Sequence, residues 1–200
     1  MARAPSFVGV ILAAGESSRM GHDKALLPWR GNTFLGAAIE SLQPHCDLVA
    51  VVGGANAESL KPVIYSRGAF LLVNPHPEQG QFSSLHVGVQ DVLNRGRDAA
   101  IITLVDRPAA SPTTVGELRN AFLETCAAGS WAVVPEYEGK HGHPIVVGRE
   151  MIQRFLDAPA TSNAREVEHA AQKMIRYVPV NDANVTANVD TPEEYARLKP

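Results

Sequence analysis

The stretch FVGVILAAGESSRMGHDK, residues 7–24, joins a short apolar run to a polar loop that contains glycine. Residues 7–12 are rich in β-branched side chains and predict a fully buried strand. Gly15 ends that run, and the polar residues after it predict a turn at the end of the strand. Residues 1–15 also resemble a secretory signal, but the short, β-rich run and the glycine favour the strand.

Outward from this stretch, the chain alternates between apolar strands and helical patterns. Further strands are expected at residues 47–54, 69–75, 99–106, 131–137, 143–148 and 174–180, and helices at 32–43, 57–68, 83–96, 111–129, 149–157, 162–172 and 191–198. Such an alternation predicts a mostly parallel sheet with helices on both faces. We therefore expect a single Rossmann-like α/β domain over residues 1–200, with its ligands beyond the carboxyl ends of the strands.

Several polar and proline residues predict where the helices begin or break. Asn32 is the expected N-cap of the first helix, and Ser83 is expected to open the helix over 83–96. Pro62 is expected to kink or break the helix over 57–68. Ser111 and Thr191 are expected to cap the helices that follow them.

Composition and charge restrict the class of partner. The chain has 18 lysines and arginines against 21 aspartates and glutamates, a formal net charge of −3. We therefore expect no nucleic-acid partner and no membrane partner, and any anion site must be local. Cys46 and Cys126 are far apart and form no disulfide framework, which favours a reducing, cytoplasmic compartment.

Three interpretations of the loop after the first strand compete on physical grounds. A P-loop needs four residues between its glycines and then Lys-Ser/Thr, whereas five residues separate Gly15 from Gly21. The glycine spacing of a dinucleotide fingerprint is also absent. A longer anion-binding loop, with Arg19 and Lys24 as its cations, and a plain solvated turn remain about equal.

The segment LAAGESSRMGHDKALLPWRG, residues 12–31, resembles the signature of the nucleotidyltransferases of molybdenum cofactor biosynthesis. Residues 10–195 follow the order of that family's motifs, and the fold it implies is that of the nucleotide-diphospho-sugar transferases. The resemblance implies that the loop holds a nucleoside triphosphate. Arg19 and Lys24 then stabilise its charge during catalysis. The nucleotide-binding residues implied for this loop are Leu12, Ala13, Ala14 and Gly15.

Two further segments resemble the family's base-binding and acceptor-binding elements. In residues 74–89, Gly80 and Ser84 are implied to lie against the nucleotide base, although a serine there can simply cap a helix. In residues 139–148, Gly142, His143 and Pro144 are implied to shape the acceptor side of the cleft. His141 and His143 also suggest zinc, but no third and fourth ligand is evident.

Acidic residues in two segments are implied to bind Mg²⁺. Asp106, in the segment VDRP, matches the family's Asp-x-Pro, and a carboxylate beside a triphosphate suits magnesium. Asp190, in NVDTPEEY, matches the second aspartate of the family's last motif, whereas Asn188 replaces the first. The alternative is that Asp106 is a turn residue and that Asp190 only introduces the last helix.

The implied reaction transfers CMP from CTP to the phosphate of a molybdopterin-type cofactor and releases pyrophosphate. The cytidylyl branch is favoured because Ala14 stands where the guanylyl branch more often has glycine. Three alternatives stay open: guanylyl transfer, transfer to a sugar phosphate, and nucleotide binding without turnover.

Overall fold

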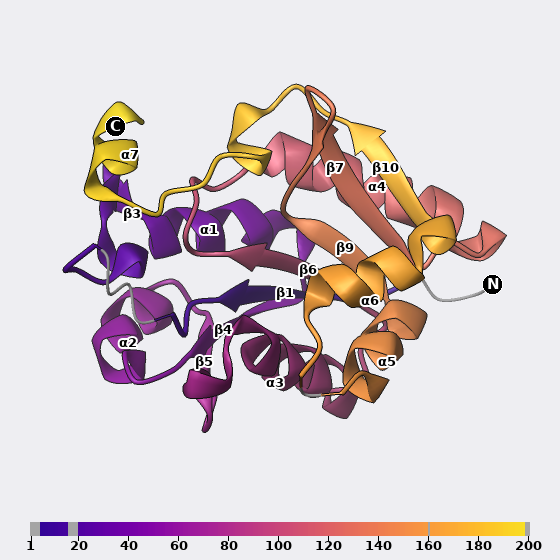
Figure 1. Ribbon diagram of the computed structural model, residues 1–200, viewed down its shortest axis with the longest axis horizontal. Helices are drawn as coiled ribbons and strands as arrows, with labels where there is room; N and C mark the ends of the chain where they lie inside the picture. The colour runs from indigo at the N-terminus through magenta and orange to yellow at the C-terminus, as the bar shows by residue number, and fades with distance from the viewer. Residues whose placement is uncertain (1–4, 16–19, 160, 199–200) are drawn as a thin grey trace.

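The computed structural model describes residues 5–15, 20–159 and 161–198. Within them, one large sheet runs through the centre of the molecule (Figure 1). Its strands have the order β10-β7-β9-β6-β1-β4-β5, and β8 pairs with the edge of β7. The bounds are β1 Phe7–Leu12, β4 Leu48–Gly53, β5 Phe70–Val73, β6 Ala99–Leu104, β7 Ala132–Tyr137, β8 Lys140–His141, β9 Ile145–Gly148 and β10 Ile175–Pro179.

The sheet is mostly parallel, as the alternating pattern predicts. Parallel pairs join β1 to β4 and β6, β4 to β5, and β7 to β10. Strand β9 runs antiparallel between β6 and β7. Strand β1 lies between β4, which follows it along the chain, and β6, which the chain reaches only after β5. The strand order therefore reverses at β1, and the carboxyl edge beside such a reversal is the usual ligand position in α/β folds.

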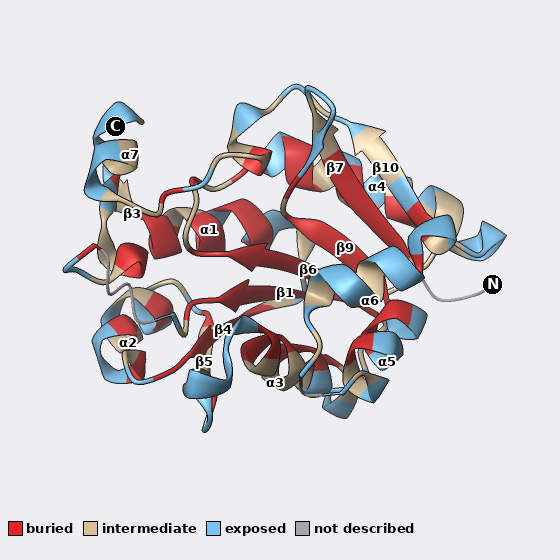
Figure 2. Cartoon of the chain, viewed as in Figure 1, coloured by how far each residue is buried: buried red, intermediate tan, exposed pale blue. Residues whose placement is uncertain are grey.

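Helices cover both faces of the sheet. Side chains of α1 (Phe34–Leu42), α2 (Ala57–Ser66) and α4 (Pro112–Thr125) form one core with alternate residues of β1. Those of α3 (Gln81–Asn94), α5 (Arg149–Asp157) and α6 (Ala164–Ala170) lie over the other face. Figure 2 shows the sheet buried between these layers, with exposed residues on the outer sides of the helices. The predicted fold class is therefore confirmed.

The predicted helix starts and breaks are only partly correct. Helix α1 is capped by Thr33, whose hydroxyl accepts from the amide of Gly36 at 3.0 Å, and not by Asn32. Helix α3 begins at Gln81 after Gly80, so Ser83 is its third residue and not its opening cap. Helix α2 continues through Pro62 without a break. Ser111 and Thr191 cap their helices as expected.

The C-terminal segment returns to the region that follows β1. Helix α7 (Pro192–Arg197) packs there, beside the β2–β3 hairpin (Pro28–Trp29 and Asn32–Thr33). The Tyr195 hydroxyl donates to the carbonyl of Pro28 at 2.6 Å, and its ring meets that of Phe34 edge-on. These contacts bring residues 188–191 next to the loop that follows β1.

Among the described residues, no helix is both long enough and apolar enough to cross a membrane.

Candidate functional site

Asn56 joins the two ends of the loop that follows β1. Its side-chain amide donates to the carbonyl of Ala13 and to the carboxylate of Asp23, both at 2.8 Å. Its side-chain oxygen accepts from the amide of Gly54 at 3.0 Å, which fixes Asn56 to the end of β4. Asn56 was not predicted from the sequence. Its position three residues after the end of a buried strand was the available signal.

The loop itself is described only in part. Arg19 lies outside the described residues, so its role stays a sequence prediction. Ala13 is buried, and its amide donates to the carbonyl of Val52 at 2.8 Å. Ala14 is half-buried and Gly15 is exposed. The start of the loop thus stays against the end of the sheet at Ala13 and becomes exposed to solvent at Gly15.

Lys24 is buried and forms an ion pair with Asp190. The Lys24 Nζ lies 2.8 Å from Asp190 Oδ1, and the lysine as a whole is only 9 % exposed. The sequence predicted these two residues from motifs at opposite ends of the chain, and the fold brings them into contact. A buried ammonium requires an anionic partner, and Asp190 is such a partner here.

Asp106 lies beside the segment that carries Asp190. The amide of Val189 donates to the carbonyl of Asp106 at 3.0 Å, so the two segments run next to each other. The Asp106 carboxylate lies 3.3 Å from Nε of Arg107. Asn188 donates its side-chain amide to Asp190 Oδ2 at 2.5 Å. The backbone segments that carry these two carboxylates and the Asn188 amide thus run side by side after β6.

This set of oxygen donors fits magnesium better than zinc. No cluster of three or more His, Cys, Asp or Glu side chains suited to a metal occurs in the part of the chain that the structure describes. Zinc sites need three or four protein ligands. Magnesium usually takes only one or two carboxylates and completes its shell with phosphate oxygens and water.

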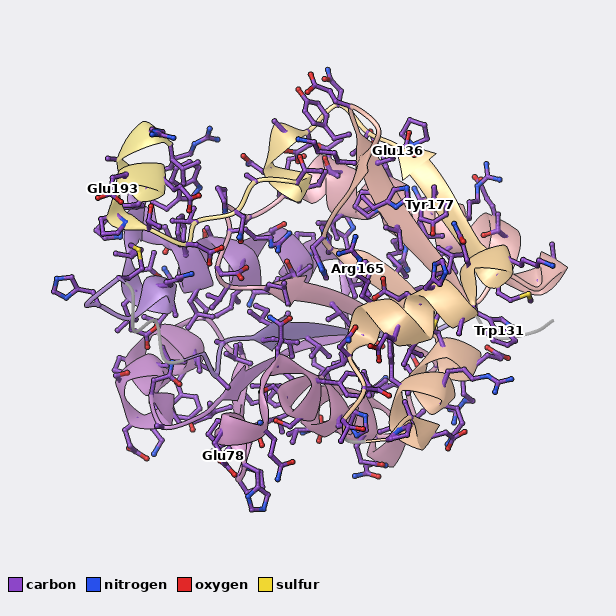
Figure 3. All side chains as sticks on the ribbon, in the orientation of Figure 1. Glu78, Trp131, Glu136, Arg165, Tyr177 and Glu193 are labelled. Carbon is purple, nitrogen blue, oxygen red and sulfur yellow. The ribbon has the colours of Figure 1, made fainter. Side chains whose placement is uncertain are left out.

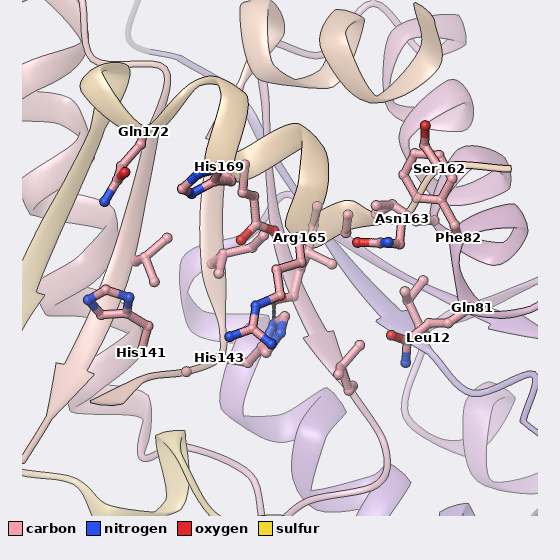
Figure 4. A pocket seen from close by; sticks show the side chains of 18 of the residues that line it. Leu12, Gln81, Phe82, His141, His143, Ser162, Asn163, Arg165, His169 and Gln172 are labelled. Carbon is pink, nitrogen blue, oxygen red and sulfur yellow. Dashed lines mark hydrogen bonds between the residues drawn. The ribbon is translucent and has the colours of Figure 1, made fainter. Parts of the chain in front are cut away.

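A pocket of about 970 Å³ lies between α6 and the sheet (Figure 4), and its lining does not include Lys24, Asp106 or Asp190. Its walls come from the end of β1, the start of α3, β6, the β7–β8 turn, α6 and β10. Of the residues implied to bind nucleotide, Leu12 and Gly80 line it, and Gly142 and His143 line it from the implied acceptor side.

Gly80 and Ser84 occupy different positions relative to this pocket. Gly80 has φ of +89°, a conformation that favours glycine, and its backbone lies on the pocket wall. Ser84 is 3 % exposed, and its hydroxyl accepts from the side-chain amide of Asn74 at 2.9 Å. The hydroxyl of Ser84 therefore holds Asn74, at the start of the loop over residues 74–80, and does not face the pocket.

His143 is held in the pocket as a neutral ring. Burial, with Arg107 nearby, lowers the pKa of His143 to about 3. Its Nδ1 faces the carbonyl of Ile102 at 3.5 Å, and its amide donates to the carbonyl of Val185 at 2.9 Å. Gly142 is required beside it, because a Cβ there would lie 1.9 Å from the oxygen of Val185. His143 can thus offer hydrogen bonds to a ligand but no charge.

One wall of the pocket was not anticipated from the sequence. It is formed by three residues of α6, namely Arg165, Glu168 and His169. The side chain of Arg165 extends toward His143 (Figure 4). Burial raises the pKa of Glu168 to about 7, although Arg165 opposes that shift. The spacing of three and four residues between these polar groups was the available signal.

On the opposite wall, His141 stacks on Tyr177 of β10. The ring centroids are 4.0 Å apart and the planes differ by 13°. His141 Nε2 lies 3.4 Å from a carboxylate oxygen of Glu136. Figure 3 shows Arg165 on α6 and Tyr177 on β10, the elements that flank the pocket. His141 is therefore part of an aromatic surface.

Curated relatives cover nearly the whole chain. Molybdenum cofactor cytidylyltransferase of Escherichia coli (strain K12) is 26 % identical over 95 % of this chain and 94 % of its own. Nicotine blue oxidoreductase of Paenarthrobacter nicotinovorans is 31 % identical over 97 % of both chains. Molybdenum cofactor guanylyltransferase of Xanthomonas euvesicatoria pv. vesicatoria (strain 85-10) is 28 % identical over 96 % and 94 %. The relatives thus differ in the activities that their names state.

A solved structure and a family model agree with these relatives. The crystal structure of Rv0371c from Mycobacterium tuberculosis H37Rv has a TM-score of 0.80 at 27 % identity, covering 96 % of this chain and 97 % of its own. The same protein was also crystallised in complex with manganese. The model of the MobA-like NTP transferase domain matches residues 9–180. The chain therefore belongs to the MobA-like NTP transferase domain family, and is a nucleotidyltransferase of that kind.

Proposed function

We propose that this nucleotidyltransferase moves CMP from CTP to the phosphate of a molybdopterin-type cofactor, with Mg²⁺ as its metal. The observation that supports this most is the contact between Lys24 and Asp190 beside Asp106, at the carboxyl edge of the sheet. One cation and two carboxylates there suit a metal-bound triphosphate. The pocket of about 970 Å³, which is lined by Leu12 at the end of β1 and Leu104 at the end of β6, has room for further parts of the substrates.

The protein contributes positioning and charge stabilisation to this reaction, and it needs no side chain that bonds covalently to the substrate. An oxygen of the acceptor phosphate attacks the α-phosphorus of CTP. That P–O bond forms as the bond to the β-phosphate oxygen breaks, and pyrophosphate leaves. Lys24 and Arg19 stabilise negative charge on the triphosphate. Asp106 and Asp190 would hold Mg²⁺, which supplies further positive charge to the phosphate oxygens when bound.

Lys24 and Asp190 have to separate, or at least share their contacts, when substrate binds. Their ion pair stabilises the lysine while no phosphate is near it. A triphosphate offers Lys24 new anionic partners, and the carboxylate of Asp190 becomes available to a cation. Binding of nucleotide and binding of metal are therefore expected to favour each other.

CTP is expected to bind more tightly than GTP. Ala14 packs closely against Gly54. A Cβ added at Gly54 would lie 3.0 Å from the Ala14 carbonyl oxygen and 3.2 Å from the Ala14 Cβ. An alanine here leaves less room for a base than a glycine would, which favours a pyrimidine. Gly80 lies on the pocket wall, and because it has no side chain a base can approach the wall closely there.

Thermal unfolding measures this preference. A ligand at about 100 times its Kd stabilises a protein by roughly 2.7 kcal/mol. For a chain of this length, that raises the midpoint by roughly 5–10 °C. With magnesium present, CTP should raise the midpoint by several degrees and GTP at the same concentration by less. An equal or larger shift with GTP would favour guanylyl transfer, the activity named for the Xanthomonas relative.

A further inference from the structure

The inner face of α6 presents a row of polar side chains to the pocket. Arg165, Glu168 and Gln172 follow one another at intervals of three and four residues, so they lie on one side of the helix and its continuation. All three line the pocket, together with His169. In Figure 4, His169 and Gln172 lie at the same end of the pocket as His141. This end therefore combines hydrogen-bonding groups with the His141–Tyr177 stack.

Glu168 has no strong partner within this arrangement. Among the described residues, no hydrogen bond or ion pair to its carboxylate is found, although Arg165 is near enough to lower its pKa. Burial nevertheless raises the pKa of Glu168 to about 7. A half-buried carboxylate without hydrogen-bond donors is unfavourable, so such a group is well placed to accept bonds from a ligand.

The chemistry of the wall defines the ligand group that it suits. A carboxylate accepts two parallel hydrogen bonds from adjacent N–H donors. The flat surface of the His141–Tyr177 pair suits a planar ring. A heterocycle that has an exocyclic amino group next to a ring N–H meets both conditions. The 2-amino-4-oxopyrimidine edge of a pterin is such a group.

We propose that Glu168 is a specificity-determining residue that binds the amino and ring N–H donors of the acceptor's pterin head group. The inference rests on the proposed function, because it takes the acceptor to be a pterin that carries a phosphate. In this arrangement, the pterin lies between α6 and the His141–Tyr177 pair, at the end of the pocket where His169 and Gln172 lie. Its phosphate then points toward the carboxyl edge of the sheet, where the triphosphate is proposed to bind.

Binding of two small pteridines tests the assignment without turnover. The probes are pterin and 2,4-dioxopteridine, in which a carbonyl oxygen replaces the amino group. Fluorescence titration at about pH 7.5, above the pKa of about 7 to which burial raises Glu168, gives both dissociation constants. The wild-type protein should bind pterin at least about tenfold more tightly, because a carbonyl oxygen facing the carboxylate loses one charge-assisted hydrogen bond and adds repulsion.

Substitution of Glu168 should alter this preference in a defined way. In Glu168→Gln the amide can donate to the carbonyl of 2,4-dioxopteridine, so the preference for pterin should fall by about tenfold or invert. Glu168→Asp keeps the charge on a shorter side chain, so it should weaken pterin binding but retain the preference. Glu166→Gln, an exposed change on the same helix that does not line the pocket, is the matched control and should behave as wild type.

The outcomes separate this inference from the proposed function. Equal binding of the two pteridines by the wild type, no binding of either, or an unchanged ratio in Glu168→Gln would overturn the role of Glu168. A thermal shift with CTP and magnesium, measured on each variant, reports folding and nucleotide binding independently. If the protein releases pyrophosphate with the full acceptor but binds the two pteridines equally, only this inference is overturned. If it prefers pterin but releases no pyrophosphate from CTP, only the cytidylyl assignment is overturned.

Discussion

Replacing Asp106 with asparagine is expected to lower kcat by about 100-fold or more, while the Kd for nucleotide changes much less. The substitution keeps the size of the side chain but removes one of the two carboxylates proposed to hold magnesium. Loss of metal-assisted charge stabilisation costs several kcal/mol of transition-state energy in comparable sites. Steady-state kinetics at saturating magnesium and equilibrium binding of the nucleotide measure the two quantities separately.

Asp157→Asn is a suitable control for this experiment. Asp157 is an exposed carboxylate at the end of α5, and its side chain accepts from Gln153 at 2.8 Å. It should retain wild-type kcat and Kd. Asp106 also contacts Arg107 at 3.3 Å, so the thermal midpoint of Asp106→Asn has to be measured beside its activity. A well-folded Asp106→Asn variant with near wild-type kcat would show that Asp106 is not a metal ligand.

Replacing Lys24 with alanine is expected to weaken binding of CTP by about 10- to 100-fold. One charge-assisted hydrogen bond contributes about 1.5–3 kcal/mol, and Lys24 is buried where the triphosphate is proposed to lie. Arg19→Ala is expected to act in the same direction, and Arg19→Lys should also bind less well because the planar fork is lost. Calorimetric titration with CTP and magnesium gives the affinities.

The half-buried surface lysine of α2 supplies the control for Lys24. Lys61 pairs with Glu58 at 2.6 Å on the outer surface, so Lys61→Ala should leave nucleotide binding unchanged. If CTP binds to Lys24→Ala and Arg19→Ala as tightly as to wild type, the loop after β1 does not hold the triphosphate.

The parts of the fold that could be predicted from sequence are those decided by local pattern. Continuous apolar runs such as residues 99–104 are buried on both faces, so they identify the central strands without tertiary information. Caps that depend on a side chain's own neighbours, such as Thr191 with Glu194, were also predictable.

The errors arose where contacts distant in sequence decide the structure. Asn32 is not the cap of α1; its side-chain oxygen instead accepts from Arg67, 35 residues away, at 2.6 Å. Helix α2 tolerates Pro62 because Leu60 and Ile64 are fully buried, and their packing offsets the lost backbone hydrogen bond. Neither contact can be inferred from local spacing.

The same distinction applies to the candidate site. The motifs that contain Lys24, Asp106 and Asp190 are each recognisable alone, and the order of the strands brings their segments together. Asn56 and Glu168 belong to no motif, and their importance depends on which segments face them in the folded chain. Side chains of this kind become visible only when the loop ends and the pocket walls are in place.

The most direct test of the proposed function is release of pyrophosphate from CTP by the purified protein, with magnesium and a molybdopterin-type acceptor. We expect release that depends on the acceptor, matches the amount of acceptor converted to its cytidylyl product, and is faster with CTP than with GTP. Absence of release with every nucleoside triphosphate in the presence of this acceptor would contradict it.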